Sequence, residues 1–294
     1  MKISTYYPYR SAEAKERYLS LYELIAKEWP IASESRMVST TYGETFVRVS
    51  GPDGAQPLVL LPGVTATSLL WATNIEGLSR QYRTYALDRA GDIGRSTCTK
   101  PMRDLSDILR WLEELFTALD LGDQINLVGL SYGGWLTAEY ALHFPNRLRK
   151  IVLLAPGATV LRTRAEFYVR MALVLTGRRY FARAAVYWLL EDLARKDASR
   201  VEKSVDRVLL TLRCLPLRRP IGPTVLTDQE LKSLGMPTLF VVGEHEKIYS
   251  AAQAVQRLNR VAPHIRTETI PNAGHDLTIV QPETVNWKIL EFLK

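Results

Sequence analysis

The chain has 294 residues, of which 47% are hydrophobic, so it is long enough and apolar enough to bury a sizeable core. Its two cysteines, Cys98 and Cys214, have neither C-x-x-C nor metal-type spacing, which argues against a disulfide framework and for reduced thiols. No apolar run is as long as a membrane span, and residues 1–10 lack the apolar stretch of a secretory signal, so we expect a cytoplasmic protein.

The first elements expected along the chain are a helix and a hairpin. Ser11 is a suitable cap for a helix over residues 12–28, whose apolar and charged positions lie on different sides. Residues 36–40 and 44–50 partly alternate in polarity on either side of Tyr42-Gly43, a pattern typical of an antiparallel hairpin.

From residue 58 onward, short apolar runs alternate with stretches of helical periodicity. Wholly apolar runs of this length are typical of strands buried on both faces, and the alternation predicts βαβ units with right-handed crossovers. We therefore expect a mainly parallel sheet. Its strands would be 58–61, 84–87, 125–128, 151–154, 238–242 and 265–270, and its helices 68–78, 104–121, 135–144, 251–261 and 280–293.

The alternation is interrupted after Ala155-Pro156-Gly157. For about seventy residues there is no strand-like run, and apolar residues such as Phe167, Met171 and Val174 recur at helical spacing. This pattern predicts a helical insertion. We expect an N-terminal helical extension over 1–35, a core formed by 36–157 and 236–294, and a helical cap over 158–235.

The positive charge is concentrated in that insertion. Residues 158–232 hold fifteen Lys or Arg against eight Asp or Glu, which accounts for the whole net charge of +7. A solvated helical face is the favoured interpretation, with attraction to anionic substrates or a membrane surface as the alternative. No nucleic-acid-binding motif accompanies the charge, so we expect no nucleic-acid partner.

The strongest functional signal is Gly129-Leu130-Ser131-Tyr132-Gly133, a G-x-S-x-G motif between a buried strand and a helix. This context is typical of a nucleophile elbow, where a tight strand-to-helix turn holds a serine hydroxyl clear of the backbone. Side chains at the two glycines would collide as strand and helix close on each other. The sequence therefore predicts Ser131 as a nucleophile.

A serine hydroxyl needs a base, and His275 is the best placed of the four histidines. It follows the last expected strand, so it would lie at the carboxyl edge of the sheet together with Ser131. His143, at a helix end, and His264, on a connecting loop, look structural. His245 directly precedes Glu246, which is a candidate for the acid of the site. An imidazole accepts and returns a proton near neutral pH, which suits the role.

The base in turn needs a carboxylate to orient it, and the loop after strand 238–242 offers two. Glu246 is the preferred acid, because the chain order Ser131, Glu246, His275 matches nucleophile, acid, base; Glu244 stays an alternative. The amides of Val64 and Tyr132 are expected to hold the oxyanion. Trp71, close in sequence to the expected catalytic elements, and Tyr168, in the insertion, are candidates for lining a substrate pocket.

These motifs, in this order, resemble the α/β-hydrolase superfamily, specifically carboxylesterase-like members with a helical cap. The resemblance covers residues 36–294 and rests on Leu60-Leu61-Pro62-Gly63 with Trp71, Asp88 through Gly94 to Ser96, the elbow, Gly243-Glu244-His245-Glu246 and Gly274-His275. It implies an eight-stranded, mostly parallel sheet, a cap after the sixth strand, and no cofactor. Members commonly have histidine where this chain has Pro62, and aspartate where it has Glu246.

The leading function is hydrolysis of a small carboxylic ester through an acyl-enzyme on Ser131. Hydrolysis of a C–C bond, lactone opening and perhydrolysis are alternatives on the same residues. Dehalogenase or epoxide-hydrolase chemistry is disfavoured, because those relatives use aspartate as the nucleophile. A non-catalytic ligand-binding or regulatory protein on a hydrolase scaffold is the alternative from another class.

Overall fold

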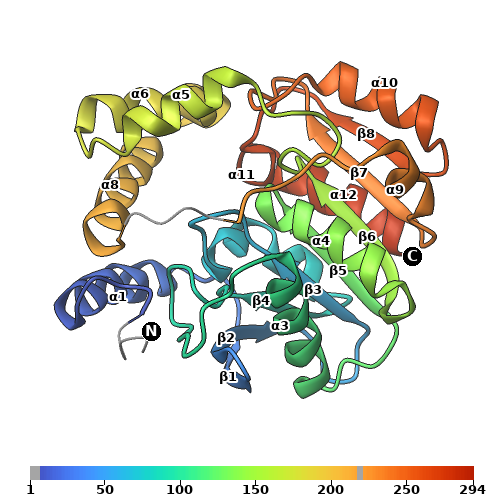
Figure 1. Cartoon of the computed structure of the whole chain (residues 1–294), viewed down its shortest axis with the longest axis horizontal. Helices are drawn as coiled ribbons and strands as arrows, with labels where there is room; N and C mark the ends of the chain where they lie inside the picture. The colour runs from blue at the N-terminus through green and yellow to red at the C-terminus, as the bar shows by residue number, and fades with distance from the viewer. Residues whose placement is uncertain (1–6, 217–220) are drawn as a thin grey trace.

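The computed structural model describes residues 7–216 and 221–294. Its centre is one eight-stranded sheet in the order β1-β2-β4-β3-β5-β6-β7-β8 (Figure 1). The hairpin strands are antiparallel to each other, β2 is antiparallel to β4, and every remaining pair is parallel. The expected eight-stranded, mostly parallel sheet is therefore confirmed. The strands are β1 Glu34–Thr40, β2 Gly43–Ser50, β3 Pro57–Leu61, β4 Arg83–Leu87, β5 Ile125–Leu130, β6 Leu148–Leu154, β7 Thr238–Gly243 and β8 Arg266–Ile270.

Two layers of helices cover the sheet, and successive residues of a strand point into opposite layers. In β3, Val59 lies in a core cluster with α3, α4 and α10, whereas Leu60 lies in a second cluster with η1, α2, α11 and α12. Both faces of the central strands are thus buried, which is why their sequences read as unbroken apolar runs. The helices are η1 Ser68–Thr73, α2 Ile75–Ser79, α3 Leu105–Ala118, α4 Tyr132–His143, α10 Ala251–Val261, α11 Leu277–Val280 and α12 Pro282–Leu293; a short η2 spans Pro145–Arg147.

The structure changes the bounds of two expected helices. The stretch 68–78 forms η1 and α2, which meet at Asn74. The expected helix 280–293 begins at Pro282 as α12, and Val280 instead ends the short α11. Pro282 has no N–H to donate back into a continuous helix, which suits it to the start of α12.

The insertion between β6 and β7 is helical, with α5 Ala165–Val174, α6 Arg179–Leu189, α7 Glu191–Lys196, α8 Ala198–Cys214 and α9 Asp228–Ser233. Helices α5, α6 and α8 stand apart from the sheet in Figure 1. Val186, Val201 and Val205 join the same apolar cluster as the main body, so this group stays packed on it. Helix α9 instead contributes Leu231 to the cluster around α10. Arg218 and Arg219 of the basic segment lie outside the described residues.

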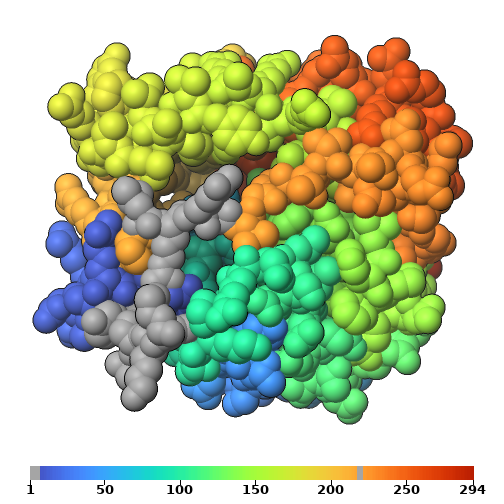
Figure 2. Space-filling view, viewed as in Figure 1, coloured from blue at the N-terminus to red at the C-terminus, as the bar shows by residue number. Residues whose placement is uncertain are grey.

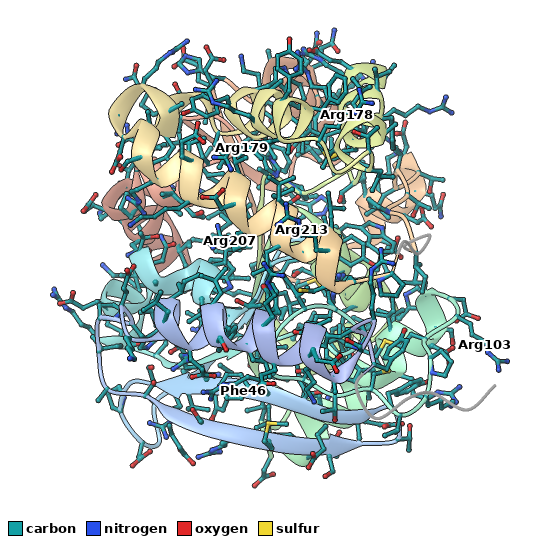
Figure 3. The ribbon with its side chains drawn as sticks, turned by 90° about the vertical axis from the view of Figure 1, so that its left-hand side faces the viewer. Phe46, Arg103, Arg178, Arg179, Arg207 and Arg213 are labelled. Atoms are coloured by element: carbon teal, nitrogen blue, oxygen red, sulfur yellow. The ribbon has the colours of Figure 1, made fainter. Side chains whose placement is uncertain are left out.

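The N-terminal helix α1 (Ala12–Ala26) lies between the hairpin and the cap, as Figure 3 shows from the side, with Phe46 below it and Arg207 and Arg213 on α8 above it. The Arg10 amide donates to the Cys214 carbonyl at 2.8 Å, and a small cluster of aromatic residues fills the space under α1. Over residues 7–216 and 221–294, no helix has the length and apolar character to cross a bilayer.

Candidate active site

Ser131 lies at the turn from β5 into α4, with φ 56° and ψ −115°. A positive φ is strained for a residue with a side chain, and here the surrounding backbone holds it. The Ser131 amide donates to the Leu154 carbonyl at 2.9 Å, and the Ser131 carbonyl accepts from the Gly157 amide at 3.0 Å. The end of the neighbouring strand β6 and the loop after it therefore hold both the amide and the carbonyl of Ser131.

The glycines on either side of Ser131 are required by the close approach of strand and helix. A Cβ on Gly129 would lie 2.1 Å from the Gly133 carbonyl oxygen, and one on Gly133 would lie 2.3 Å from the Leu61 carbonyl oxygen. Neither distance is compatible with a side chain, and both obstacles are backbone atoms. The turn therefore has the geometry expected of a nucleophile elbow.

His275 and Glu246 form a buried hydrogen-bonded pair. The His275 ring lies 2.9 Å from the carboxylate, through Nδ1 and Oε2. Because a carboxylate only accepts, Nδ1 carries the proton, which leaves Nε2 of the neutral ring with a lone pair. The other oxygen of Glu246 accepts from the Ile248 amide at 2.9 Å, so the carboxylate is held at both ends.

Two opposing influences act on the pKa of His275. Burial is the larger single influence and lowers the pKa, because it disfavours the charged ring. The charge of Glu246, its hydrogen bond and the charge of Asp276 act in the other direction and together raise the pKa above the ordinary 6.5. A ring in this environment is well suited to accept a proton and hold the resulting charge.

The three proposed catalytic residues lie just after strands whose carboxyl ends share one edge of the sheet. Ser131 directly follows β5, and Glu246 and His275 lie in the loops after β7 and β8. The structure also separates the two candidate acids. Glu246 contacts His275, whereas the half-exposed Glu244 accepts from the Asn272 amide at 3.2 Å.

The other three histidines have hydrogen-bond partners of their own outside this pair. The His143 ring bonds to the Glu139 carbonyl at 2.8 Å and the His264 ring to the Leu234 carbonyl at 3.1 Å, as expected of structural residues. His245 pairs with Asp192 of the cap, a contact that sequence reasoning missed. No local signal could have found it, because Asp192 is 53 positions away on a cap helix.

The loop after β3 approaches Ser131 closely. A Cβ on Gly63 would lie 3.6 Å from the Cβ of Ser131, so the expected oxyanion loop and the serine are in contact. The amides of Val64 and Tyr132 have no hydrogen-bond acceptor in the described part of the chain. Two amides without acceptors beside the serine are what an oxyanion would need.

A second group that sequence reasoning missed fixes this loop. The Thr65 amide donates to Oδ2 of Asp92 at 3.0 Å, and Asp92 also forms an ion pair with the largely buried Arg89. The Arg89 guanidinium lies 4.2 Å from the centre of the Tyr132 ring, within cation–π range. Arg89 and Asp92 thus connect the two segments that carry the candidate oxyanion amides.

The two aromatic residues expected near the substrate are placed differently from each other. Trp71 is fully buried in the cluster that holds Leu277 and Val280, whereas Tyr168 is 58% exposed on α5. Figure 2 shows the surface hollowed between the yellow-green cap and the teal part of the main body. A separate open groove of about 650 Å³ beside α10 and β8 is lined by none of Ser131, Glu246 and His275.

Comparison with known proteins identifies the family of this fold. A family model described as alpha/beta hydrolase fold matches residues 56–282. The chain is 35% identical to carboxylesterase YbfK of Bacillus subtilis, over 97% of this chain and 96% of that one. The crystal structure of naproxen esterase from Bacillus subtilis superimposes with a TM-score of 0.88 at 32% identity, covering 97% of this chain and 100% of that one.

A C–C bond hydrolase is a more distant relative. The 2-hydroxy-6-oxo-2,4-heptadienoate hydrolase of Pseudomonas putida is 27% identical, over 85% of this chain and 92% of its own length. The carboxylesterases therefore match over more of the chain and at higher identity, which supports an ester hydrolase. By the match of its family model and of these relatives, the chain belongs to the α/β-hydrolase fold family.

Proposed function

We propose that the protein hydrolyses a small carboxylic ester with Ser131 as nucleophile, His275 as base and Glu246 as the acid that orients it. The observation that carries this proposal is the buried 2.9 Å hydrogen bond between His275 and Glu246, on the sheet edge where Ser131 has its strained turn. The similarity to carboxylesterases supports an ester as the substrate class.

In this mechanism His275 takes the hydroxyl proton as Ser131 attacks the ester carbonyl carbon. The negative charge that develops on the carbonyl oxygen is held by the amides of Val64 and Tyr132. His275 then gives the proton to the leaving alcohol, and the acyl group stays on Ser131. Water, activated by the same imidazole, releases the acid and restores the serine.

A fluorophosphonate probe tests the nucleophile directly. We expect stoichiometric labelling of Ser131 in the folded protein, no labelling of Ser131→Ala, and normal labelling of Ser20→Ala, an exposed serine on α1. Labelling that persists in Ser131→Ala, or is absent from the folded wild type, would contradict the proposal.

A series of p-nitrophenyl esters of increasing acyl length tests the substrate class. We expect kcat to fall by on the order of 10⁴-fold or more in Ser131→Ala for every ester that the wild type hydrolyses. If the wild type hydrolyses no ester of the series but cleaves a vinylogous diketone, the function is C–C bond hydrolysis on the same residues. A tight stoichiometric complex with a ligand that is never turned over indicates the non-catalytic alternative.

A further inference from the structure

Exposed large apolar side chains are concentrated on one part of the cap. The described residues include nine such side chains, and five of them lie between residues 168 and 180. They are Tyr168, Val169, Leu173, Leu175 and Tyr180, with Val169 60% and Tyr180 77% exposed. Single exposed apolar residues are ordinary, but a group of this kind within one short segment, from α5 to the start of α6, marks an interaction surface.

The spacing shows that helix α5 is apolar on both sides. Phe167, Met171 and Val174 are partly or fully buried on the inner side. Tyr168, Val169, Ala172 and Leu173 are exposed and recur at helical intervals on the outer side. A helix on a solvated surface would have polar residues there, so the outer side of α5 is suited to contact a non-aqueous environment.

Positive charge surrounds this face. Arg162, Arg164 and Arg178 are exposed, and in the described ranges of the chain none of them forms an ion pair. The single acidic residue of α5, Glu166, is already paired with Arg170 at 2.6 Å. The face therefore combines apolar side chains with uncompensated arginines, which suits a surface that is apolar inside and negatively charged at its boundary.

We propose that the outer face of α5, with the turn that leads into α6, docks on an anionic phospholipid membrane surface. Tyr168 and Tyr180 would lie at the headgroup level, where a ring with a polar hydroxyl is favoured. Val169, Leu173 and Leu175 would reach the acyl boundary, and Arg164 and Arg178 would contact lipid phosphates. A symmetric dimer through this face is disfavoured, because it would bring the same unpaired arginines together.

The position of α5 determines how the docked protein would be oriented on the membrane. In Figure 2, α5 runs along the upper edge of the hollow between the cap and the main body. Figure 3 shows Arg178 in the upper part of the molecule, on the opposite side of the cap from Phe46. Docking would therefore place the cap at the lipid surface and leave the sheet on the aqueous side. This inference is independent of the proposed ester hydrolysis.

Flotation with vesicles tests the proposal. We expect the wild type to bind vesicles of phosphatidylglycerol and phosphatidylcholine, to bind pure phosphatidylcholine much more weakly, and to be released at high salt. The double variants Val169→Gln/Leu173→Gln and Arg164→Gln/Arg178→Gln should each lower the partition coefficient by about tenfold or more.

Matched substitutions elsewhere provide the controls. Leu24→Gln on α1 removes an equally exposed apolar residue, and Arg103→Gln removes an exposed arginine that also lacks an ion pair in the described chain; both should bind like wild type. Circular dichroism melts establish that every variant is folded. The proposal is overturned if folded wild type does not bind anionic vesicles, or if the α5 variants bind as well as the controls. Sedimentation that shows a dimer abolished by the α5 variants, without vesicle binding, overturns it in favour of a second copy.

Discussion

The carboxylate of Asp192, on cap helix α7, lies 3.0 Å from Nδ1 of His245, the residue directly before Glu246. The next amide of the same helix, that of Leu193, donates at 2.8 Å to Asp276, the residue directly after His275. One short cap helix is therefore bonded to both loops that carry the proposed acid and base. Burial is the largest influence on the pKa of the Asp276 carboxyl and raises it. The charge of Asp192 lies close enough to act in the same direction.

This relationship predicts that Asp192 positions the two loops. In Asp192→Ala the bond to His245 is lost, and we expect the free energy of unfolding to fall by about 2 kcal/mol, with a lower kcat. Asp192→Asn keeps an acceptor oxygen and should recover most of both quantities. Asp206→Ala, an exposed residue on α8, is the control. Chemical denaturation and ester kinetics measure the effects, and equal behaviour of the Ala and Asn variants would show that the bond has no positioning role.

The raised pKa of His275 predicts the acid side of the pH–rate profile. The base works only as a neutral ring, so activity is present above the pKa and is lost as the pH falls through it. Because the pKa lies above 6.5, half of kcat/KM should already be lost at a pH above 6.5. A midpoint at or below that value would contradict the assignment.

Replacing Glu246 should shift the acid limb of the pH–rate profile to lower pH. Glu246→Gln removes the charge that raises the pKa and leaves the burial that lowers it, so the acid limb should shift to lower pH. We expect kcat to fall by on the order of 10⁴-fold, because the Gln amide can donate to Nδ1 and favour the wrong ring tautomer, and it no longer stabilises the charged ring. Glu244→Gln, on the same loop, should retain the wild-type profile; a loss of activity in that variant instead would assign the acid to Glu244.

The glycine before the elbow should be irreplaceable. Gly129→Ala places a Cβ 2.1 Å from a backbone oxygen that cannot move without displacing α4, and we expect a loss of about 4 kcal/mol or more in the free energy of unfolding. Gly54→Ala is the contrasting control, because Gly54 has a positive φ, 75°, but no neighbour within 4 Å, so its substitution strains the backbone without a collision. The Gly54→Ala substitution should lower the free energy of unfolding by about 1–2 kcal/mol. Thermal unfolding of the two variants measures the difference.

The oxyanion loop can be tested through Asp92, although its donors are backbone amides. Asp92→Ala removes the acceptor of the Thr65 amide, and the neighbouring Val64 amide should lose its alignment. We expect kcat to fall by about tenfold with little change in KM, as for an interaction made in the transition state. Stability should also fall, because Arg89 loses its buried partner. Asp92→Asn keeps an acceptor for the Thr65 amide but not the charge that pairs with Arg89, so it should restore kcat more than stability. If Asp92→Ala changes only KM, Asp92 acts in substrate binding instead.

Much of the fold could be predicted from local patterns. The expected helix 251–261 agrees with α10 at both ends, and the strands differ from expectation by a few residues at most, as in β6, which begins at Leu148 rather than 151. Local capping and apolar periodicity decide such elements. Two helix bounds differ from expectation: the stretch 68–78 is divided at Asn74, and the last helix starts at Pro282 rather than at 280, because proline has no N–H to donate.

The sequence by itself determined that a serine stands at a strand-to-helix turn and that a histidine and two glutamates follow later strands, because glycine spacing and strand order are local properties of the chain. Only the tertiary structure decided that Glu246 rather than Glu244 meets His275, that Asp192 and Asp92 hold the loops, and that Tyr168 faces outward from α5. Those outcomes depend on how side chains from distant segments pack together, and no spacing along one segment encodes that.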